Sequence, residues 1–181
     1  MFWRSVPPTH STGSYYLLLS VWDVRMATET ATTTGVSIET GNWKAGVAGG
    51  LGGALVFGAM MSVLTPGVLE MAIPAMYGVG GPAGAVGWVI HMSHGAVIGV
   101  AFAGVANLRP GLGDSIGSSL GVGAGYGLLV WIALAVIAMP IWLSAVGFAG
   151  APPLPNVGVE SLVGHVVYGT VLGGVYAAVA N

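Results

Sequence analysis

Four long apolar segments alternate with connections rich in proline, glycine or polar residues. They cover residues 44–65, 85–106, 116–139 and 158–180, and each is close to the about 20 residues that a membrane-spanning helix needs. Glycine is abundant in these segments, which would weaken a soluble helix but is common in membrane helices that pack closely. The pattern therefore predicts an all-α integral membrane protein with four transmembrane helices.

The composition supports a lipid environment for this chain. Of its 181 residues, 55% are hydrophobic and only 6% are charged, whereas a soluble protein carries about 25% charged residues. The net charge of −2 and the lack of a basic patch argue against a nucleic-acid partner. The absence of cysteine excludes disulfides, thiolate metal sites and thiol catalysis.

The N-terminal part of the chain does not follow the apolar pattern. Residues 1–42 are predicted to form a polar, disordered segment, because the apolar run 15–22 is too short to cross a bilayer. Met26 offers a second plausible start, so we expect residues 1–25 to come from an over-extended gene model. The single lysine, Lys44, and the Thr/Glu-rich segment 26–40 indicate a salt-adapted organism, a halophile.

The positions of lysine and arginine predict the orientation in the membrane. All four lie before or at the start of the first helix, or between the second and third helices, namely Arg4, Arg25, Lys44 and Arg109. The positive-inside rule then places both termini in the cytoplasm of a multi-pass protein of the plasma membrane. The connection 69–77 is expected to lie along the outer membrane surface, with a re-entrant dip as the alternative.

An internal repeat relates the two halves of the membrane domain, residues 43–181. The motif His-x3-Gly-x3-Gly-x2-aromatic begins at His91 and again at His165, 74 residues later, and the same spacing relates Pro66 to Pro140. We predict two repeats, about 43–107 and about 117–181, each a helical hairpin. Because each hairpin crosses the membrane twice, the two hairpins run in the same sense and form a four-helix bundle.

Glycines at four-residue spacing are the predicted helix–helix interfaces. Lipid tails are as apolar as leucine, so membrane helices associate by close backbone approach over small residues. The predicted packing positions are Gly49, Gly53, Gly95, Gly99, Gly123, Gly127, Gly169 and Gly173.

His91 and His165 are the main candidates for a ligand or proton site, because ionisable residues within a membrane usually face protein or a water-filled cavity. The pair could hold a haem iron, bind a metal with His94, or relay protons. It could also only fix packing, through hydrogen bonds to a neighbouring helix. Glu160 could orient His165, or remain solvated at a helix N-terminus. No catalytic residue is predicted, and the cofactor is left open.

The His-x3-Gly-x3-Gly-x2-aromatic motif, together with a first helix that ends at a proline, resembles the pattern of a known family. Residues 43–181 resemble a family of small prokaryotic multi-pass membrane proteins, largely haloarchaeal, of uncharacterised function. Some members carry the label histidine kinase. This chain lacks the residues of an ATP-binding kinase core, so we do not expect a kinase, and the resemblance implies no mechanism or cofactor.

Three functions are compatible with these features. The first is a small binding or transport module with a His-lined polar site in the outer half of the bundle. The second is a non-catalytic subunit that docks through glycine-rich helix faces, as a homo-oligomer or onto another membrane protein. The third is a b-type haem protein. A polar cavity that reaches both histidines would favour the first function. A tightly packed centre with an outward-facing glycine surface would favour the second. A slot wide enough for a porphyrin would be required for the third.

Overall fold

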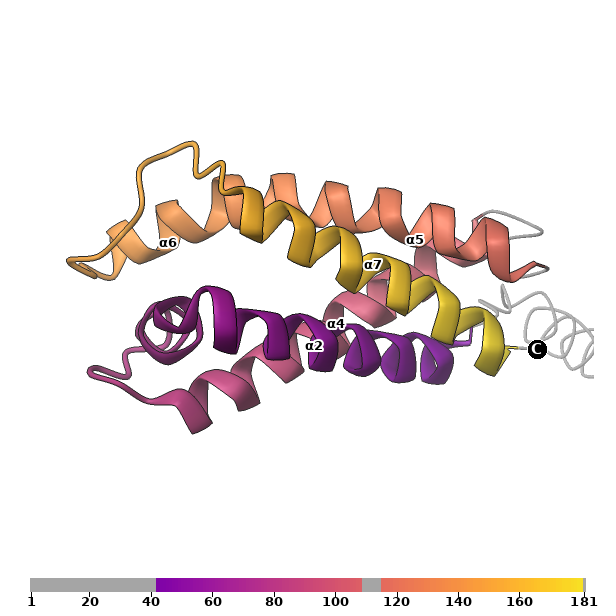
Figure 1. The fold of residues 1–181 in the computed structure, drawn as a ribbon, viewed down its shortest axis with the longest axis horizontal. Coiled ribbons are helices and arrows are strands. Elements are labelled where there is room, and N and C mark those ends of the chain that lie inside the picture. The colour runs from indigo at the N-terminus through magenta and orange to yellow at the C-terminus, as the bar shows by residue number, and fades with distance from the viewer. Residues whose placement is uncertain (1–41, 109–114, 181) are drawn as a thin grey trace, which may run out of the picture. The chain divides into compact units, whose positions relative to one another are not determined.

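Four helices long and apolar enough to cross a membrane make up most of the computed structural model, which describes residues 42–108 and 115–180 (Figure 1). They are α2 (Trp43–Leu64), α4 (Gly84–Asn107), a continuous helix Ile116–Ala145 and α7 (Val159–Ala180). The prediction of an all-α, four-span membrane protein is confirmed. The predictions for residues 1–41 lie outside the described residues.

The third span is longer than predicted. It consists of α5 (Ile116–Val130), the π-helical segment η2 (Trp131–Ala138) and α6 (Met139–Ala145), so Pro140 does not end the helix as expected. A proline inside an α-helix removes one N–H donor and clashes with the preceding turn. The wider π-helical turns of η2 precede Pro140, and such local adjustment is how membrane helices accommodate proline.

Asn156 compensates for the donor that Pro140 lacks. Within a regular helix the N–H of residue 140 would bond to a carbonyl four or five residues earlier, at Val136 or Ala135. Asn156 instead donates its backbone N–H to Val136 O at 3.1 Å and its side-chain amide to Ala135 O at 3.3 Å. The connection between α6 and α7 is thereby tied to the third span.

The connection between α2 and α4 is helical and packs on α4. It contains the π-helical turn η1 (Val68–Ala72) and the short helix α3 (Ile73–Ala75), in which Leu69 and Pro74 are buried. The backbone of Leu69 approaches α4 so closely at Gly87 that no Cβ would fit there. Both connections lie at the same end of the bundle (Figure 1), which we call the connection end; α2 begins and α7 ends at the opposite, terminal end.

Glycines bring three pairs of helices into close contact: α2 with α4, α5 with α7, and α2 with α7. Gly95 and Gly99 of α4 meet the backbone of α2, and Gly169 and Gly173 of α7 meet that of α5. On a second face of α2, Gly49 contacts Leu172 of α7. Each of the eight glycines named from the sequence lies against another helix; the remaining three are Gly53, Gly123 and Gly127.

The two hairpins correspond at a spacing of 73 residues in their first helices, not 74. A Cβ built on Gly50 would lie 3.0 Å from Gly99 Cα, and one built on Gly123 would lie 3.0 Å from Gly173 Cα. The capping residues, Asn42 of α2 and Ser115 of α5, have the same spacing of 73. Gly49, which lies 74 residues before Gly123, faces α7 instead. The evolutionary repeat itself stays a prediction.

Tyrosines connect α4 to the second hairpin, because the described glycines make no close contact between these elements. The buried Tyr168 of α7 donates a hydrogen bond to Gly95 O at 2.8 Å, and Tyr126 of α5 donates one to Ile98 O at 2.9 Å. The motif aromatics, Phe102 and Tyr176, meet edge to face with ring centroids 5.3 Å apart. Aromatic rings thus fill the space between α4 and the second hairpin.

Removing the hydroxyl of Tyr168 is expected to lower stability. Tyr168→Phe leaves Gly95 O without its side-chain donor in an apolar interior, so we expect the free energy of unfolding to fall by about 1 kcal/mol. Denaturant unfolding in one detergent measures the change. Tyr176→Phe is the control, because no hydrogen bond of the Tyr176 hydroxyl is found among the described residues. An equal effect of the two substitutions would contradict the bridging role.

Candidate functional site

His91 is a buried residue of α4 with a packing partner on the neighbouring helix. Its side chain is 8% exposed, and Nε2 lies 2.9 Å from Ala54 O of α2. A carbonyl can only accept a hydrogen bond, so this contact requires the proton on Nε2. The arrangement is the one expected if His91 fixes the contact between α2 and α4.

His165 is half-buried on α7 and bonds to its own helix. Its Nδ1 lies 2.7 Å from Ser161 O, one turn earlier, which places the proton on Nδ1. The described residues provide no hydrogen-bond partner for Nε2 of His165. The two histidines of the repeated motif therefore make different polar contacts.

Both imidazoles pack on one aromatic ring, that of Phe57 on α2. The ring centroid of Phe57 lies 5.6 Å from that of His91 and 4.8 Å from that of His165, edge to face in both cases. Trp88 also packs edge to face on His91, with ring centroids 6.2 Å apart. Sequence reasoning did not single out Phe57, because one phenylalanine in an apolar helix carries no distinguishing signal.

The histidine arrangement does not fit a haem. A bis-histidine haem requires both imidazoles to direct a nitrogen at one iron. Nε2 of His91 is directed at Ala54 O, and Phe57 packs against both rings. The described residues also contain no group of three or more His, Asp or Glu side chains placed to hold a metal ion.

His94 belongs to a separate aromatic cluster rather than to a site with His91. A hydrogen bond joins its Nε2 to the hydroxyl of Tyr77. Tyr77 also packs on Trp142 of α6, with ring centroids 5.5 Å apart. Tyr77 and Trp142 are exposed, so the cluster links the connection between α2 and α4 to helix α4 and to the end of the third span.

Glu160 is exposed in the first turn of α7. His165 is bonded to Ser161, and no hydrogen bond links it to Glu160. Of the two roles predicted for Glu160, the geometry favours a solvated carboxylate at a helix N-terminus, where it interacts well with the helix dipole.

An open groove of about 400 Å³ lies between α2 and α4. Its lining is almost entirely apolar and includes neither His91 nor His165. The lining residues are Leu51, Trp88, Val89, Met92, Ser93 and Ala96. This groove is therefore not the polar, His-lined site considered from the sequence.

Within residues 42–108 and 115–180, a row of glycines on α5 is left without a neighbouring helix. Gly117, Gly121 and Gly125 are all exposed, and a Cβ built on any of them would have no neighbour within 4 Å. They share one helix face because they are four residues apart. The sequence contains this Gly-x3-Gly-x3-Gly pattern, although the packing positions predicted on this helix are Gly123 and Gly127. We call these three residues the α5 glycine face.

Four apolar spans joined by close glycine contacts define a multi-pass α-helical membrane protein. Comparison of the chain with protein-family models, with curated proteins and with solved structures finds no match. The function must therefore be inferred from the geometry alone.

Proposed function

We propose that this protein is a non-catalytic membrane subunit that acts by lateral association through the α5 glycine face. The observation that carries the proposal is the exposure of Gly117, Gly121 and Gly125. The eight packing glycines named from the sequence all lie against another helix of the same chain. In a bilayer, an open glycine face such as that of α5 is stabilised by the close approach of a second helix.

The partner that this face fits best is a second copy of the chain. Two copies inserted in the same sense bring the same three glycines to the same depth in the membrane. A face that meets itself across a twofold axis forms a closed, isologous dimer. The exposed side chains of Leu128 and Ile132 continue the α5 surface toward the connection end and would extend the contact beyond the glycines.

The packing around the histidines supports an assembly role over a transport site. A His-lined polar cavity would be expected for a transport module, whereas Phe57 packs against both rings and His91 is bonded to Ala54 O. A tightly packed centre with an outward-facing glycine surface is the combination that favours the docking subunit.

We further propose that the protein lies in the plasma membrane and that its terminal end faces the cytoplasm. Lys44 stands at the start of α2 at the terminal end, and Arg109 follows α4 in the sequence. The connections that lead from α2 to α4 and from α6 to α7 carry no lysine or arginine. The positive-inside rule then places the connection end outside.

Gly121→Ile tests the association. We expect the wild-type protein to be dimeric in vesicles and this substitution to weaken the dimer by at least about tenfold, because a branched side chain prevents close backbone approach. Energy transfer between two labelled populations measures the dissociation constant. Gly104→Ile is the matched control, since Gly104 is an open glycine on α4.

Two results would overturn the assignment. One is a wild-type protein that stays monomeric at every protein-to-lipid ratio. The other is an unchanged dimer in Gly121→Ile, which would place the interface elsewhere. Circular dichroism and the thermal midpoint of each variant separate lost association from lost folding.

A further inference from the structure

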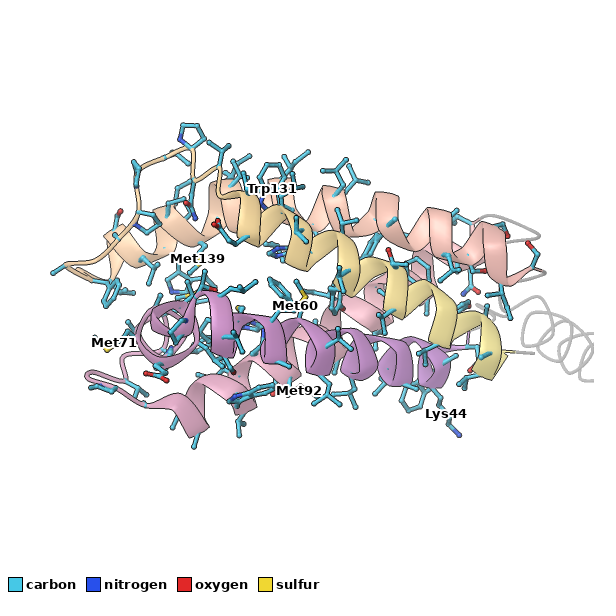
Figure 2. All side chains as sticks on the ribbon, viewed as in Figure 1. Lys44, Met60, Met71, Met92, Trp131 and Met139 are labelled. Atoms are coloured by element: carbon cyan, nitrogen blue, oxygen red, sulfur yellow. The ribbon has the colours of Figure 1, made fainter. Side chains whose placement is uncertain are left out.

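The groove between α2 and α4 opens on the side of the bundle, where hydrocarbon surrounds a membrane protein. Its lining runs along α4 from Trp88 to Ala96, a distance of about 12 Å. Figure 2 places Met92, one of its lining residues, at the outer surface of the α2/α4 pair, away from α5. An open, apolar groove in this position faces the lipid chains of a bilayer.

A carboxylate stands at the connection end of this groove. A Cβ built on Gly84 would lie 3.4 Å from Cγ of Glu70. Trp88 is four residues beyond Gly84, so it lies on the same face of α4, one turn further into the span. The exposed side chain of Glu70 therefore lies about one helical turn from Trp88, the groove residue nearest the connection end.

The charge at this end is negative and has no basic counterpart among the described residues. Lys44 is the single lysine or arginine within residues 42–108 and 115–180. Figure 2 shows Lys44 at the terminal end and Met71, the neighbour of Glu70, at the connection end. A ligand seated in the groove would complement Glu70 best if its polar part carried a positive charge.

We propose that the groove binds one phospholipid with a primary ammonium headgroup. The acyl chain lies along Leu51, Met92 and Ala96, with Trp88 toward the headgroup, and the ammonium pairs with the carboxylate of Glu70. An ammonium donates hydrogen bonds to a carboxylate as well as attracting it. The site is independent of the α5 glycine face, which belongs to a different helix.

The fluorescence of Trp88 reports occupancy directly. The other five tryptophans are replaced by phenylalanine, and the protein is placed in phosphatidylcholine vesicles. These contain increasing fractions of chain-brominated phosphatidylethanolamine or chain-brominated phosphatidylglycerol, because bromine quenches indole on contact. We expect phosphatidylethanolamine to compete for the site about threefold better than phosphatidylglycerol, the scale of an exposed ion pair.

Two substitutions assign the effect to the groove and to Glu70. Glu70→Gln is expected to abolish the preference between headgroups, whereas Glu160→Gln, at an exposed carboxylate of α7, leaves it unchanged. Ala96→Phe fills the groove and is expected to reduce quenching by both lipids. Native mass spectrometry of the unsubstituted protein in an equimolar lipid mixture gives a second measure, independent of the tryptophan replacements.

Three outcomes would overturn the proposal. Equal quenching by the two brominated lipids, together with equal retention of the two lipids on the protein in the mass spectrum, would show that the site has no headgroup preference. A preference that survives Glu70→Gln removes the role of the carboxylate. Trp88 fluorescence that neither lipid quenches means that protein, such as a second copy, covers the groove.

Discussion

Gly99→Ala is expected to destabilise the protein by about 3 kcal/mol, at the upper end of what an overpacked interior usually costs. Gly99 of α4 lies against α2, where a new Cβ would meet Gly46 O and would stand 2.8 Å from Gly50 Cα. These neighbours are backbone atoms, so no side chain can rotate away. The two helices must move apart, and the contacts along their whole interface are lost.

Gly104→Ala is the matched control, because it adds the same methyl group to the same helix. A Cβ on Gly104 meets nothing within 4 Å, and alanine is up to about 1 kcal/mol better than glycine in a helix. We therefore expect a neutral or slightly stabilising effect. Denaturant titration in a single detergent gives both free energies of unfolding. Equal values for the two variants would refute the close contact between α2 and α4.

Phe57→Ala is expected to cost about 3–5 kcal/mol, the usual range for emptying a buried phenylalanine site. Phe57 is 8% exposed, and its ring packs against His91, His165 and the backbone at Gly164. Its loss leaves a void between α2, α4 and α7 that none of these helices can close alone. Leu129→Ala, at a residue 64% exposed on α5, should cost far less. The free energy of unfolding of each variant provides the comparison.

A double substitution tests the placement of the Phe57 ring more directly. A Cβ on Gly164 would lie 2.7 Å from Cζ of Phe57, so Gly164→Ala should be destabilising in the wild-type background. In a Phe57→Leu background the shorter side chain leaves room, and the same alanine should cost at least about 0.5 kcal/mol less. Strictly additive effects would show that the two positions do not touch.

Hydropathy was sufficient to predict the four spans, because a bilayer requires long apolar helices. It could not predict the end of the third span. Pro140 is a helix terminator in most contexts, and its accommodation depends on Asn156, which is 16 residues away and reaches the carbonyls of Ala135 and Val136 through the fold. No local sequence signal reports such a contact.

The sequence singled out the two histidines of the repeated motif but could not predict their contacts. The repeat brought attention to His91 and His165, and both imidazoles do pack on Phe57. Their hydrogen bonds differ because Ala54 O lies within reach of His91, whereas His165 bonds back to Ser161. The 74-residue spacing also pairs Gly49 with Gly123, because glycine is frequent in α2. In the structure, Gly50 makes the contact with α4 that corresponds to the contact of Gly123 with α7.

The third span, Ile116–Ala145, has 30 residues, about 45 Å of helix, whereas the hydrocarbon core of a bilayer is about 30 Å thick. Its exposed side chains remain apolar toward the connection end, at Ile132, Ile137 and Ile141. This hydrophobic mismatch must be met by tilting the helix or by stretching the surrounding lipids. Two copies joined through α5 would share one ring of stretched lipids and would expose less of this helix than two monomers do. The mismatch is larger in a thinner membrane, so thinner membranes should favour the dimer.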